Sequence, residues 1–363
     1  MATVYDIARQ AGVSTATVSR VVHGSDLVRP ETRQRVTDVI ERLGFVPDAS
    51  AQGLSTRRKD IIGLVALERG ADEIDIERSS LLYVDEIVHA VESVLRGSEV
   101  SLLLSFGPRG ASFQRRIRTL SGKVDGLLMA EDVLPRSELA ALARRVPVVL
   151  IAGPADVADL DTIAVDNAGG IRAVVSHLAS AHGYRRLCFV SGPADSPDAR
   201  QRLAVFEEVV RTTARCTADR PIHGDFSEAS GSDAGRALLT RPRLPEAVAC
   251  ANDQMAIGLL REFRRAGVAV PGDVAVTGFD DIYPSRMTDP PLTTVSQPLR
   301  DLGSMAARRL LDRVGRIDRD DRSHGSDDRD DRSHGSDVPP TAEVLPTRLV
   351  IRCSCGCPAP GAG

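Results

Sequence analysis

Small hydroxyl groups and one cation share the exposed face of a short helix that the sequence predicts close to the N-terminus. Ser14 is a suitable N-cap, and Val18, Val21 and Val22 recur at helical spacing on the other side of that helix. A narrow helix with such groups suits the major groove of DNA, where side chains hydrogen-bond to base edges. The residues of this face are Thr15, Ala16, Thr17, Ser19 and Arg20.

The neighbouring residues predict two further helices that would position this face. Thr3 is a suitable N-cap for a first helix, which ends at Gly12, where the backbone freedom of glycine permits a tight turn. A third helix begins at Pro30 and ends at Gly44. This pattern predicts a helix-turn-helix that binds DNA. The alternative is a small helical hairpin packed on a larger domain.

Length and charge fit DNA contact by one end of the molecule. The 363 residues exceed one ordinary core, so two or three domains are expected, and 42% hydrophobic with 26% charged residues is typical of a soluble globular protein. The net charge is −4, but residues 1–60 hold nine Lys or Arg against seven Asp or Glu, a net +2. A mildly basic head on an acidic body favours local contact with DNA and argues against a protein that coats nucleic acid.

The sequence predicts neither a signal peptide nor a membrane span. Residues 1–25 mix polar and apolar residues and lack a continuous apolar region, and no run of about 18 apolar residues occurs anywhere. We therefore expect a cytoplasmic protein without a membrane partner.

The cysteines are of two kinds. Cys188, Cys216 and Cys250 are isolated and are expected to be reduced thiols. A second group stands in the run Cys353-Ser-Cys-Gly-Cys357. Zinc sites usually combine Cys-x2-Cys pairs into four ligands, whereas the spacing here is one and no adjacent His completes a set. We therefore expect residues 353–363 to be a disordered tail, and a metal site is the alternative.

A weakly apolar segment follows the three helices. Pro47 and Asp48 can begin a short helix, but Gly53 lowers its helix propensity by up to about 1 kcal/mol. Such a segment is expected to be disordered alone and to fold against a partner. The basic run that ends at Lys59 would favour a phosphate backbone. The alternative is a plain interdomain linker.

From Ile61 onward short apolar runs alternate with amphipathic helices, which predicts parallel sheets covered by helices. The alternation restarts after Asp161, so two similar lobes are expected, with ligands at the carboxyl ends of their strands. The predicted strands are 61–67, 100–104, 124–129, 146–152, 163–165, 187–190, 247–251, 274–277 and 344–351. The predicted helices are 84–95, 113–120, 137–145, 170–181, 199–212, 254–266 and 299–314.

Residues 318–327 and 328–337 are identical copies of one ten-residue sequence without an apolar residue. Such a repeat cannot join a core, so a disordered loop is expected. Its His324 and His334 lie near aspartates and could bind a metal, but a duplication tolerated in an exposed loop is the simpler interpretation.

Several motifs resemble the signature of the lactose-repressor (LacI/GalR) family of bacterial transcription regulators. The resemblance covers residues 3–352 apart from the repeat. The motifs of the head are Asp6-Ile-Ala, Ala11-Gly-Val-Ser, Thr17-Val-Ser-Arg and Gly44-Phe-Val-Pro. Those of the body are Val165-Asp-Asn, Gly183-Tyr-Arg-Arg, Ala251-Asn-Asp-Gln-Met-Ala, Gly278-Phe-Asp-Asp and Pro291-Leu-Thr-Thr-Val-Ser-Gln-Pro.

The resemblance implies a fold class and a domain organisation. The fold is an N-terminal all-α helix-turn-helix headpiece with a hinge helix, followed by an α/β two-lobed effector domain with parallel sheets, like the type I periplasmic binding proteins. The headpiece would be 1–46, the hinge 47–59 and the effector and dimerisation domain 60–352. The N-lobe would be 60–161 with 292–317, and the C-lobe 162–291 with 340–352.

The resemblance also implies a homodimer on a pseudo-palindromic DNA operator. Thr15, Ala16 and Arg20 should face bases, and paired hinge helices should enter the minor groove, where Leu54 would wedge into a base step. Ala51 and Gln52 would lie beside Leu54. The family usually has Asn where His23 stands. The residues expected on phosphates are Tyr5, Ser14, Thr17, Ser19 and His23.

A small-molecule effector, carbohydrate-like by resemblance, should bind in the cleft between the lobes and control the hinge allosterically. Arg202 matches the ligand-binding arginine of the family, Asn252 and Asp280 match the polar residues opposite it, and Phe226 fits the aromatic platform. Taken singly, Arg202 is compatible with a surface ion pair, and Asn252 and Asp280 with turns or caps.

Some residues depart from the family pattern. Ala152 stands where many sugar-binding members carry Asp, Leu67 where a polar residue is frequent, and Val205 where Gly is usual. Residues 68–80 replace a short loop. The N-lobe side of the pocket is therefore expected to be unusual, and a simple hexose is less secure as the ligand.

Three other classes of protein were weighed. A solute-binding protein would need a signal peptide and has no use for residues 1–60. An enzyme is disfavoured because no Walker motif, Gly-x-Ser-x-Gly or Gly-x-Gly-x-x-Gly after a strand occurs, so no catalytic residue or cofactor is expected. A DNA-binding regulator that lacks effector response stays open because of the altered pocket.

Overall fold

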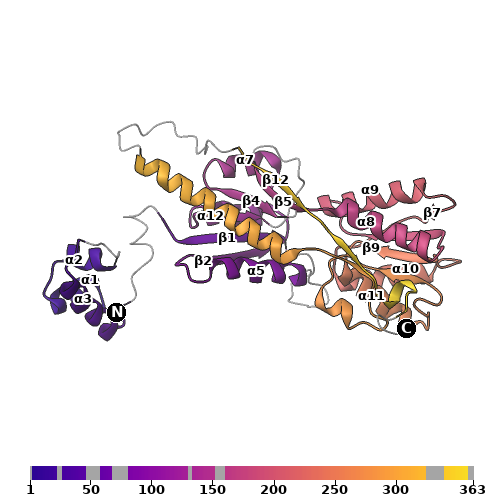
Figure 1. Cartoon of the computed structure of the whole chain (residues 1–363), viewed down its shortest axis with the longest axis horizontal. Helices are drawn as coiled ribbons and strands as arrows, with labels where there is room; N and C mark the ends of the chain where they lie inside the picture. The colour runs from indigo at the N-terminus through magenta and orange to yellow at the C-terminus, as the bar shows by residue number, and fades with distance from the viewer. Residues whose placement is uncertain are drawn as a thin grey trace. The chain divides into compact units, whose positions relative to one another are not determined.

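The computed structural model describes residues 2–22, 27–45, 58–67, 81–129, 133–151, 160–323 and 339–358. The chain divides into two compact units, Met1–Lys59 and Asp60–Gly363 (Figure 1). Several predictions lie outside the described residues. They are those for His23, Ala51, Gln52, Leu54, the loop 68–80 and Ala152.

The first unit holds three helices, α1 (Val4–Ala11), α2 (Thr15–Val22) and α3 (Pro30–Leu43). Thr3 and Asp6 form a reciprocal capping box on α1, and Gly12 ends that helix with a left-handed φ of 65°. The core contains Ile7, Val18 and Val36, each fully buried. The predicted turn and caps therefore hold three short helices around one small apolar core.

The first lobe of the second unit is built on a six-stranded parallel sheet in the order β12-β5-β4-β3-β1-β2. Apolar side chains of α5 and α12 pack on one face of this sheet, and those of α6 and α7 on the other. The strands are β1 (Ile61–Leu67), β2 (Ser101–Gly107), β3 (Gly126–Met129), β4 (Val148–Ile151), β5 (Asp161–Val165) and β12 (Ala342–Leu345). The helices are α5 (Leu81–Leu95), α6 (Ala111–Ser121), α7 (Arg136–Ala143) and α12 (Leu299–Ser323).

Two strands lie in a different lobe from the one predicted. Both β5 and β12 were expected in the second lobe, but they pair with each other and complete the first sheet. The buried carboxylate of Asp161 fixes this edge, because it accepts hydrogen bonds from Arg309 and Arg313 of α12 and from the Thr341 backbone beside β12. The long predicted strand 344–351 is divided into β12 and a separate strand, β13 (Arg348–Val350).

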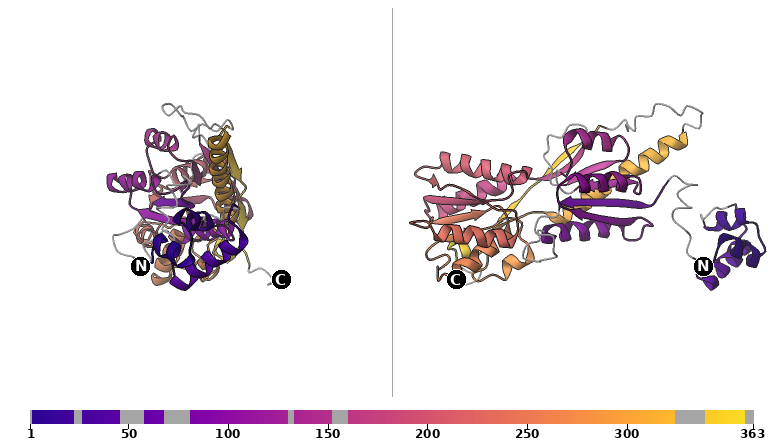
Figure 2. Two further views of the ribbon diagram at one scale, coloured as in Figure 1. Left: turned by 90° about the vertical axis from the view of Figure 1, so that its left-hand side faces the viewer. Right: turned by 180° about the vertical axis from the view of Figure 1, so that it is seen from behind.

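The second lobe has a five-stranded parallel sheet in the order β10-β9-β6-β7, with β8 also paired to β6. The pink helices α8 and α9 and the orange helices α10 and α11 lie on opposite faces of this sheet (Figure 2). The strands are β6 (Arg186–Ser191), β7 (Thr217–Ala218), β8 (Ile222–His223), β9 (Ala247–Cys250) and β10 (Ala275–Thr277). The helices are α8 (Asn167–Ser176), which continues as the π-helical turn η1 (His177–Ala181), α9 (Pro197–Thr212), α10 (Glu228–Leu239) and α11 (Asp253–Arg265).

The helix α10 was not predicted, because its sequence is rich in Ser and Gly and low in large apolar residues. Its glycines are there for close contact with α11. A Cβ atom at Gly231 would overlap the backbone of Met255, and one at Gly258 of α11 would overlap the backbone of Glu228. Small residues thus replace apolar side chains as the means of packing these two helices.

The chain passes between the two lobes after β5, before α12 and after β12. At these crossings β11 (Thr294–Ser296) pairs antiparallel with β13, and the Asp166 backbone N–H donates to the Leu345 carbonyl. Figure 1 shows the yellow segment with β12 and β13 running from one lobe to the other. Any change in the angle between the lobes must bend these segments.

Two segments predicted to be disordered are ordered in part. The helix α12 continues through Ser323 into the first copy of the repeat, since extending an existing helix adds one hydrogen bond for each residue fixed. Residues 324–337 of the repeat lie outside the described residues. The expected tail begins with the 3-10 turn η3 (Cys353–Cys355), where buried Ser354 donates to the Val276 carbonyl and accepts from the Thr293 N–H.

Among the described residues, no helix is long and apolar enough to cross a membrane.

The contact between α10 and α11 makes a prediction about stability. Replacing Gly258 by Ala inserts a methyl group into the Glu228 backbone, so we expect the free energy of unfolding to fall by about 2 kcal/mol or more in urea titrations. The control is Gly315→Ala in α12, where no heavy atom lies within 4 Å of the added Cβ atom. That change should be neutral or stabilising by about 0.5–1 kcal/mol. Equal effects of the two substitutions would contradict this account of the packing.

Candidate functional site

The exposed face of α2 presents the groups that the sequence predicted. Buried Val18 and Val21 hold one side of the helix on the headpiece core, which turns the other side outward. The Ser14 hydroxyl accepts a hydrogen bond from the Thr17 N–H and lies 2.9 Å from the Thr17 hydroxyl, so the helix tip carries a capped pair of hydroxyls. The exposed residues are Ser14, Thr15, Ala16, Ser19 and Arg20, with Thr17 half-buried.

Tyr5 adds an aromatic hydroxyl on the neighbouring helix. Its side chain is 78% exposed at the start of α1, although it is large and partly apolar. The exposed phenol hydroxyl is available to a binding partner. His23, Ala51, Gln52 and Leu54 are not placed by the described residues.

A pocket lies in the second unit, at the carboxyl ends of β1, β6 and β9. It is a hollow of about 480 Å³ that is partly open to solvent, and it contains all four residues predicted to bind the effector. Its lining residues are Leu67, Tyr83, Val84, Ser196, Asp198, Arg202, Phe226, Asn252 and Asp280.

Arg202 is the centre of the polar side of the pocket. Only 4% of its surface is exposed, and its guanidinium lies over the Phe279 ring at 3.8 Å from the ring centroid. Nε donates to the Asn167 side-chain oxygen at 2.8 Å, and Nη1 donates to the Ala251 carbonyl at 2.6 Å. Arg202 is therefore a buried, positioned cation, and the surface ion pair considered from the sequence is excluded.

The carboxylate of Asp280 faces this cation. Its Oδ1 lies 3.7 Å from Arg202 Nη1 and accepts a hydrogen bond from Gln297 Nε2. Burial raises the pKa of Asp280 to about 7, although Arg202 and the Gln297 hydrogen bond act in the opposite direction. The backbone of Asp280 has a φ of 122°, an unusual value for a residue with a side chain. Such strained backbone is frequent where a structure positions a polar group for binding.

Two more acidic side chains are buried close by, Asp198 beside Arg202 and Asp253 beside Asp280. Burial raises the pKa of Asp198, against the opposing charge of Arg202, and Asp198 accepts a hydrogen bond from Asn167. Burial and the neighbouring Asp280 raise the pKa of Asp253 well above its usual value. Of these carboxyls, Asp198 and Asp280 line the pocket, where they can hold protons as well as accept hydrogen bonds, which suits a ligand with several hydroxyl or amide groups.

Asn252 and Phe226 are fixed by local structure. Asn252 caps α11, because its Oδ1 accepts from the Met255 N–H, and its Nδ2 donates to the Phe226 carbonyl at 2.9 Å. Phe226 has a left-handed φ of 74°, and its ring lies so close to Gly192 that a Cβ atom there would overlap it. The cap role considered for Asn252 is therefore present, and the same residue still lines the pocket.

The first lobe presents an apolar wall to the pocket. Leu67 is buried at the end of β1, and Tyr83 and Val84 come from the start of α5. Leu67, which departs from the family pattern, contributes an apolar side chain to this wall. Among the described residues, the pocket therefore has a charged side from the second lobe and an apolar, aromatic side from the first.

Some pocket residues were not predicted. Asp198 and Asn167 form a hydrogen-bonded group with Arg202, and Tyr83 lies on the opposite wall. Asn167 stands inside the motif Val165-Asp-Asn, and Asp198 lies one helical turn before Arg202, so both could have been inferred from spacing on α8 and α9. Tyr83 follows residues 68–80, and the sequence offers no signal that brings it to the pocket.

A three-helix DNA-reading headpiece and a two-lobed domain with a polar interlobe pocket together define the class of ligand-binding DNA regulators. Residues 3–48 match the model of the bacterial regulatory proteins of the lacI family, and residues 175–355 match the periplasmic binding protein-like domain. The chain belongs to the LacI family of bacterial transcription regulators, and it is a DNA-binding regulator.

Curated relatives and solved structures support this assignment along most of the chain. The chain is 35% identical to the transcriptional regulator CelR of Thermobifida fusca, over 85% of this chain and 90% of that protein. It is 30% identical to catabolite control protein A of Priestia megaterium, over 85% and 91%. The Lac repressor dimer bound to operator and the anti-inducer ONPF superposes with a TM-score of 0.79 at 28% identity, covering 98% of this chain and 99% of that chain.

The raised pKa of Asp280 predicts how the free energy of unfolding depends on pH. Because its folded pKa of about 7 exceeds the unfolded value of about 3.9, the native state binds the proton more tightly. This stabilisation is complete below the unfolded pKa and is lost as the pH rises through the folded pKa. The stability of the wild-type chain relative to Asp280→Asn should therefore fall by about 1 kcal/mol per pH unit between pH 5 and 7 and level off above that.

Urea titrations of both proteins at pH 5, 6, 7 and 8 measure this difference. Asn tolerates the positive φ at this position and keeps an acceptor for Gln297, so the variant should fold. The control is Asp289→Asn, which removes an exposed carboxyl from a nearby loop. A stability difference for Asp280→Asn that does not change with pH would show that Asp280 carries no proton in the folded state.

Proposed function

We propose that the protein is a repressor that binds a pseudo-palindromic operator as a homodimer and responds to a small molecule in the interlobe pocket. The observation that carries this proposal is the buried Arg202 network, which joins the pocket to the segments where the chain passes between the lobes. The exposed face of α2 supplies the DNA-reading end. Operator and dimer are proposed by analogy with the Lac repressor dimer of the superposed structure.

The headpiece offers the chemistry that a major-groove reader needs. Arg20 can donate two hydrogen bonds to a guanine, and Ala16 and the Thr15 methyl can contact a thymine methyl. These small side chains fit within the width of the major groove. Ser14, Thr17, Ser19 and Tyr5 would donate to phosphates and fix the register of the helix. Leu54, with Ala51 and Gln52 beside it, would complete the contact through a hinge helix in the minor groove, and His23 would contact a phosphate.

The pocket suits a ligand with a polar edge and an apolar face. Arg202 and the amide of Asn252 donate hydrogen bonds, and the carboxyls of Asp198 and Asp280 accept or donate them according to their protonation. Phe226 supplies an aromatic platform on the same side. A sugar ring or a related metabolite has such an arrangement of hydroxyls around a less polar face.

The network gives a route from the ligand to the interlobe angle. Arg202 contacts Asn167, the first residue after one crossing, and Asp280 contacts Gln297, just before another. The Asp280 N–H also donates to the Val295 carbonyl in β11. A ligand that replaces or tightens any of these bonds has different affinities for two interlobe angles, which is the physical requirement for allosteric control.

Arg20 gives the first test of this proposal. With an operator selected from random duplexes, Arg20→Ala should weaken binding by about 10- to 100-fold in fluorescence anisotropy, because a bidentate base contact is lost. Arg35→Ala removes the same charge from an exposed position on α3 and should change binding much less. Sedimentation should give two chains per duplex. Equal losses for both variants would mean that Arg20 adds charge without reading sequence.

Arg202 gives the test of effector binding. We expect a thermal-shift screen of mono- and disaccharides, nucleosides and phosphorylated metabolites to find a ligand that raises the melting temperature. Arg202→Lys keeps the charge but loses the planar fork, so the shift should be abolished. The control Arg200→Lys changes an exposed neighbour on the same helix and should keep it.

Circular dichroism checks that both Arg variants are folded. If no compound in the panel shifts the melting temperature while operator binding is intact, the alternative of a regulator without effector response is supported. The apolar wall at Leu67 is the observation that favours this alternative.

A further inference from the structure

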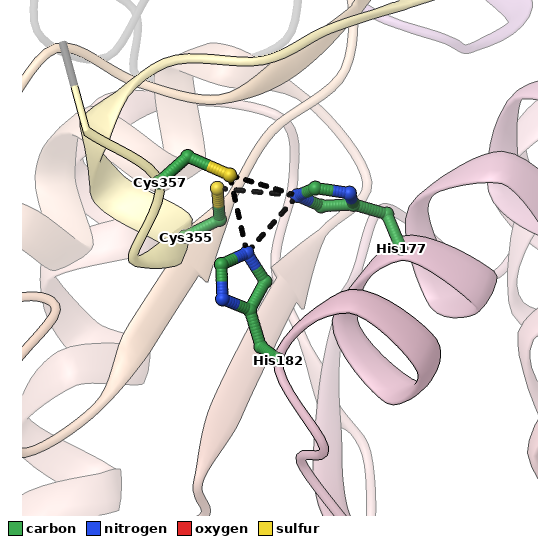
Figure 3. A group of neighbouring side chains, drawn as sticks. All are labelled: His177, His182, Cys355 and Cys357. Atoms are coloured by element: carbon green, nitrogen blue, oxygen red, sulfur yellow. Dashed lines mark hydrogen bonds between the residues drawn. The ribbon is translucent and has the colours of Figure 1, made fainter. Parts of the chain in front are cut away.

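Four metal-ligating side chains meet at the outer end of the second lobe, away from the effector pocket. His177 and His182 come from the end of the helix that begins as α8, and Cys355 and Cys357 come from the segment after β13 (Figure 3). Their ligand atoms all lie within 4.8 Å of one another. No histidine is adjacent to these cysteines in the sequence, and the fold brings His177 and His182 to them from far along the chain.

Four of the six separations between these ligand atoms are close to those of a tetrahedral zinc site. Zinc–nitrogen bonds of about 2.0–2.1 Å and zinc–sulfur bonds of about 2.3 Å place two nitrogens about 3.4 Å apart and a nitrogen and a sulfur about 3.6 Å apart. The two histidine Nε2 atoms are 3.2 Å apart. Cys357 Sγ lies 3.3 Å from His182 Nε2 and 3.7 Å from His177 Nε2, and Cys355 Sγ lies 3.4 Å from His177 Nε2.

The helix is distorted at the point where it carries the two histidines. Residues five apart on an α-helix point in directions about 140° apart, so His177 and His182 could not converge on one. The turn His177–Ala181 is π-helical, with hydrogen bonds to residues five apart, which brings such residues onto one face. Single π-helical turns are frequent at functional sites, and this one serves the cluster directly.

The turn between the two cysteines also lets their sulfur atoms approach one point. Gly356 has a φ of 105°, which residues with side chains rarely adopt, and a Cβ atom there would come within 3.2 Å of His182 Nδ1 and 3.1 Å of the Tyr184 hydroxyl. Glycine therefore lets Cys355 and Cys357 direct both sulfurs at the same point. A disordered tail would need neither the left-handed backbone nor the close approach.

A second layer of contacts holds the ligands. The Thr293 hydroxyl donates to Cys355 Sγ at 3.1 Å, and the Tyr184 hydroxyl donates to the Cys355 carbonyl at 3.2 Å. The ring of His182 stacks on that of Tyr184. Donors to a sulfur and packing around an imidazole are the outer contacts that orient metal ligands and stabilise a thiolate.

We propose that His177, His182, Cys355 and Cys357 form a tetrahedral site for a zinc ion. Two thiolates and two imidazoles are the donor set that selects zinc among the common divalent ions, and hard ions such as Mg²⁺ and Ca²⁺ prefer oxygen ligands. Four protein ligands close the coordination sphere, so the ion has a structural and not a catalytic role. It fastens the end of the chain to the helix α8, whose first residue, Asn167, accepts a hydrogen bond from Arg202.

The position of the site gives the ion a defined effect on the fold. The segment after β13 is the far end of one interlobe crossing, and Arg352 there already pairs with Asp281 beside the pocket. Zinc adds a second attachment three to five residues farther along the chain. Removal of the ion should therefore release the end of the crossing segment and lower the melting temperature of the second unit.

Metal analysis of the full-length, untagged chain tests the proposal. After dialysis against zinc chloride and then buffer without chelator, mass spectrometry of the metal should find about one zinc ion per chain. The variant His182→Gln with Cys357→Ser changes only partly exposed ligands and should retain less than about a tenth of that zinc. The matched control Cys353→Ser removes the neighbouring cysteine, which lies outside the cluster, and should bind zinc like the wild type.

Two further readouts distinguish a cluster that binds metal from side chains that only pack together. Cobalt-loaded wild-type protein should show the intense visible absorption of tetrahedral thiolate-bound cobalt, and the double variant should not. A strong chelator should lower the melting temperature of the wild type and leave that of the folded double variant unchanged. Wild-type protein without bound zinc, or with a Cys355–Cys357 disulfide in its intact mass, would overturn the proposal, as would full zinc retention by the double variant.

Discussion

A charged guanidinium enclosed in the second lobe is the constraint on which the organisation of the pocket depends. Only 4% of Arg202 is exposed, so the protein surrounds it with carbonyl and amide oxygens, carboxyls and an aromatic ring. The same enclosure raises the pKa of Asp198 and Asp280. In the proposed mechanism, a ligand that enters the pocket would join a network that is already assembled, and its contacts would replace bonds that hold the crossing segments.

The proposed control of DNA binding depends on where those crossing segments lie. The first lobe continues from the headpiece in sequence, while the polar side of the pocket belongs to the second lobe. The lobes are linked after β5, before α12 and after β12, and Arg202 and Asp280 contact residues at two of these links through Asn167 and Gln297. A shift in the interlobe angle is therefore the mechanical output that the pocket can produce, and the proposed zinc ion would anchor the remaining link at its far end.

Features that depend on local spacing could be predicted from the sequence, and features that depend on distant contacts could not. The capping box at Thr3, the turn at Gly12 and the face of α2 follow from residue types a few positions apart. The helix α10 could not be predicted, because its packing relies on glycines whose partners lie on α11. The sequence also did not predict that β12 belongs to the first lobe or that Cys355 lies next to His177. Both features depend on contacts between residues far apart along the chain.

The most direct test of the account is the operator affinity of the full-length protein as the pocket ligand is titrated, measured by fluorescence anisotropy beside calorimetry of ligand binding. The account predicts that a saturating ligand changes the operator dissociation constant of the wild type by at least about fivefold. It also predicts no change for Arg202→Lys at the same ligand concentration. A ligand that saturates the wild-type pocket by calorimetry and leaves the operator affinity unchanged would contradict the claim that the Arg202 network controls DNA binding.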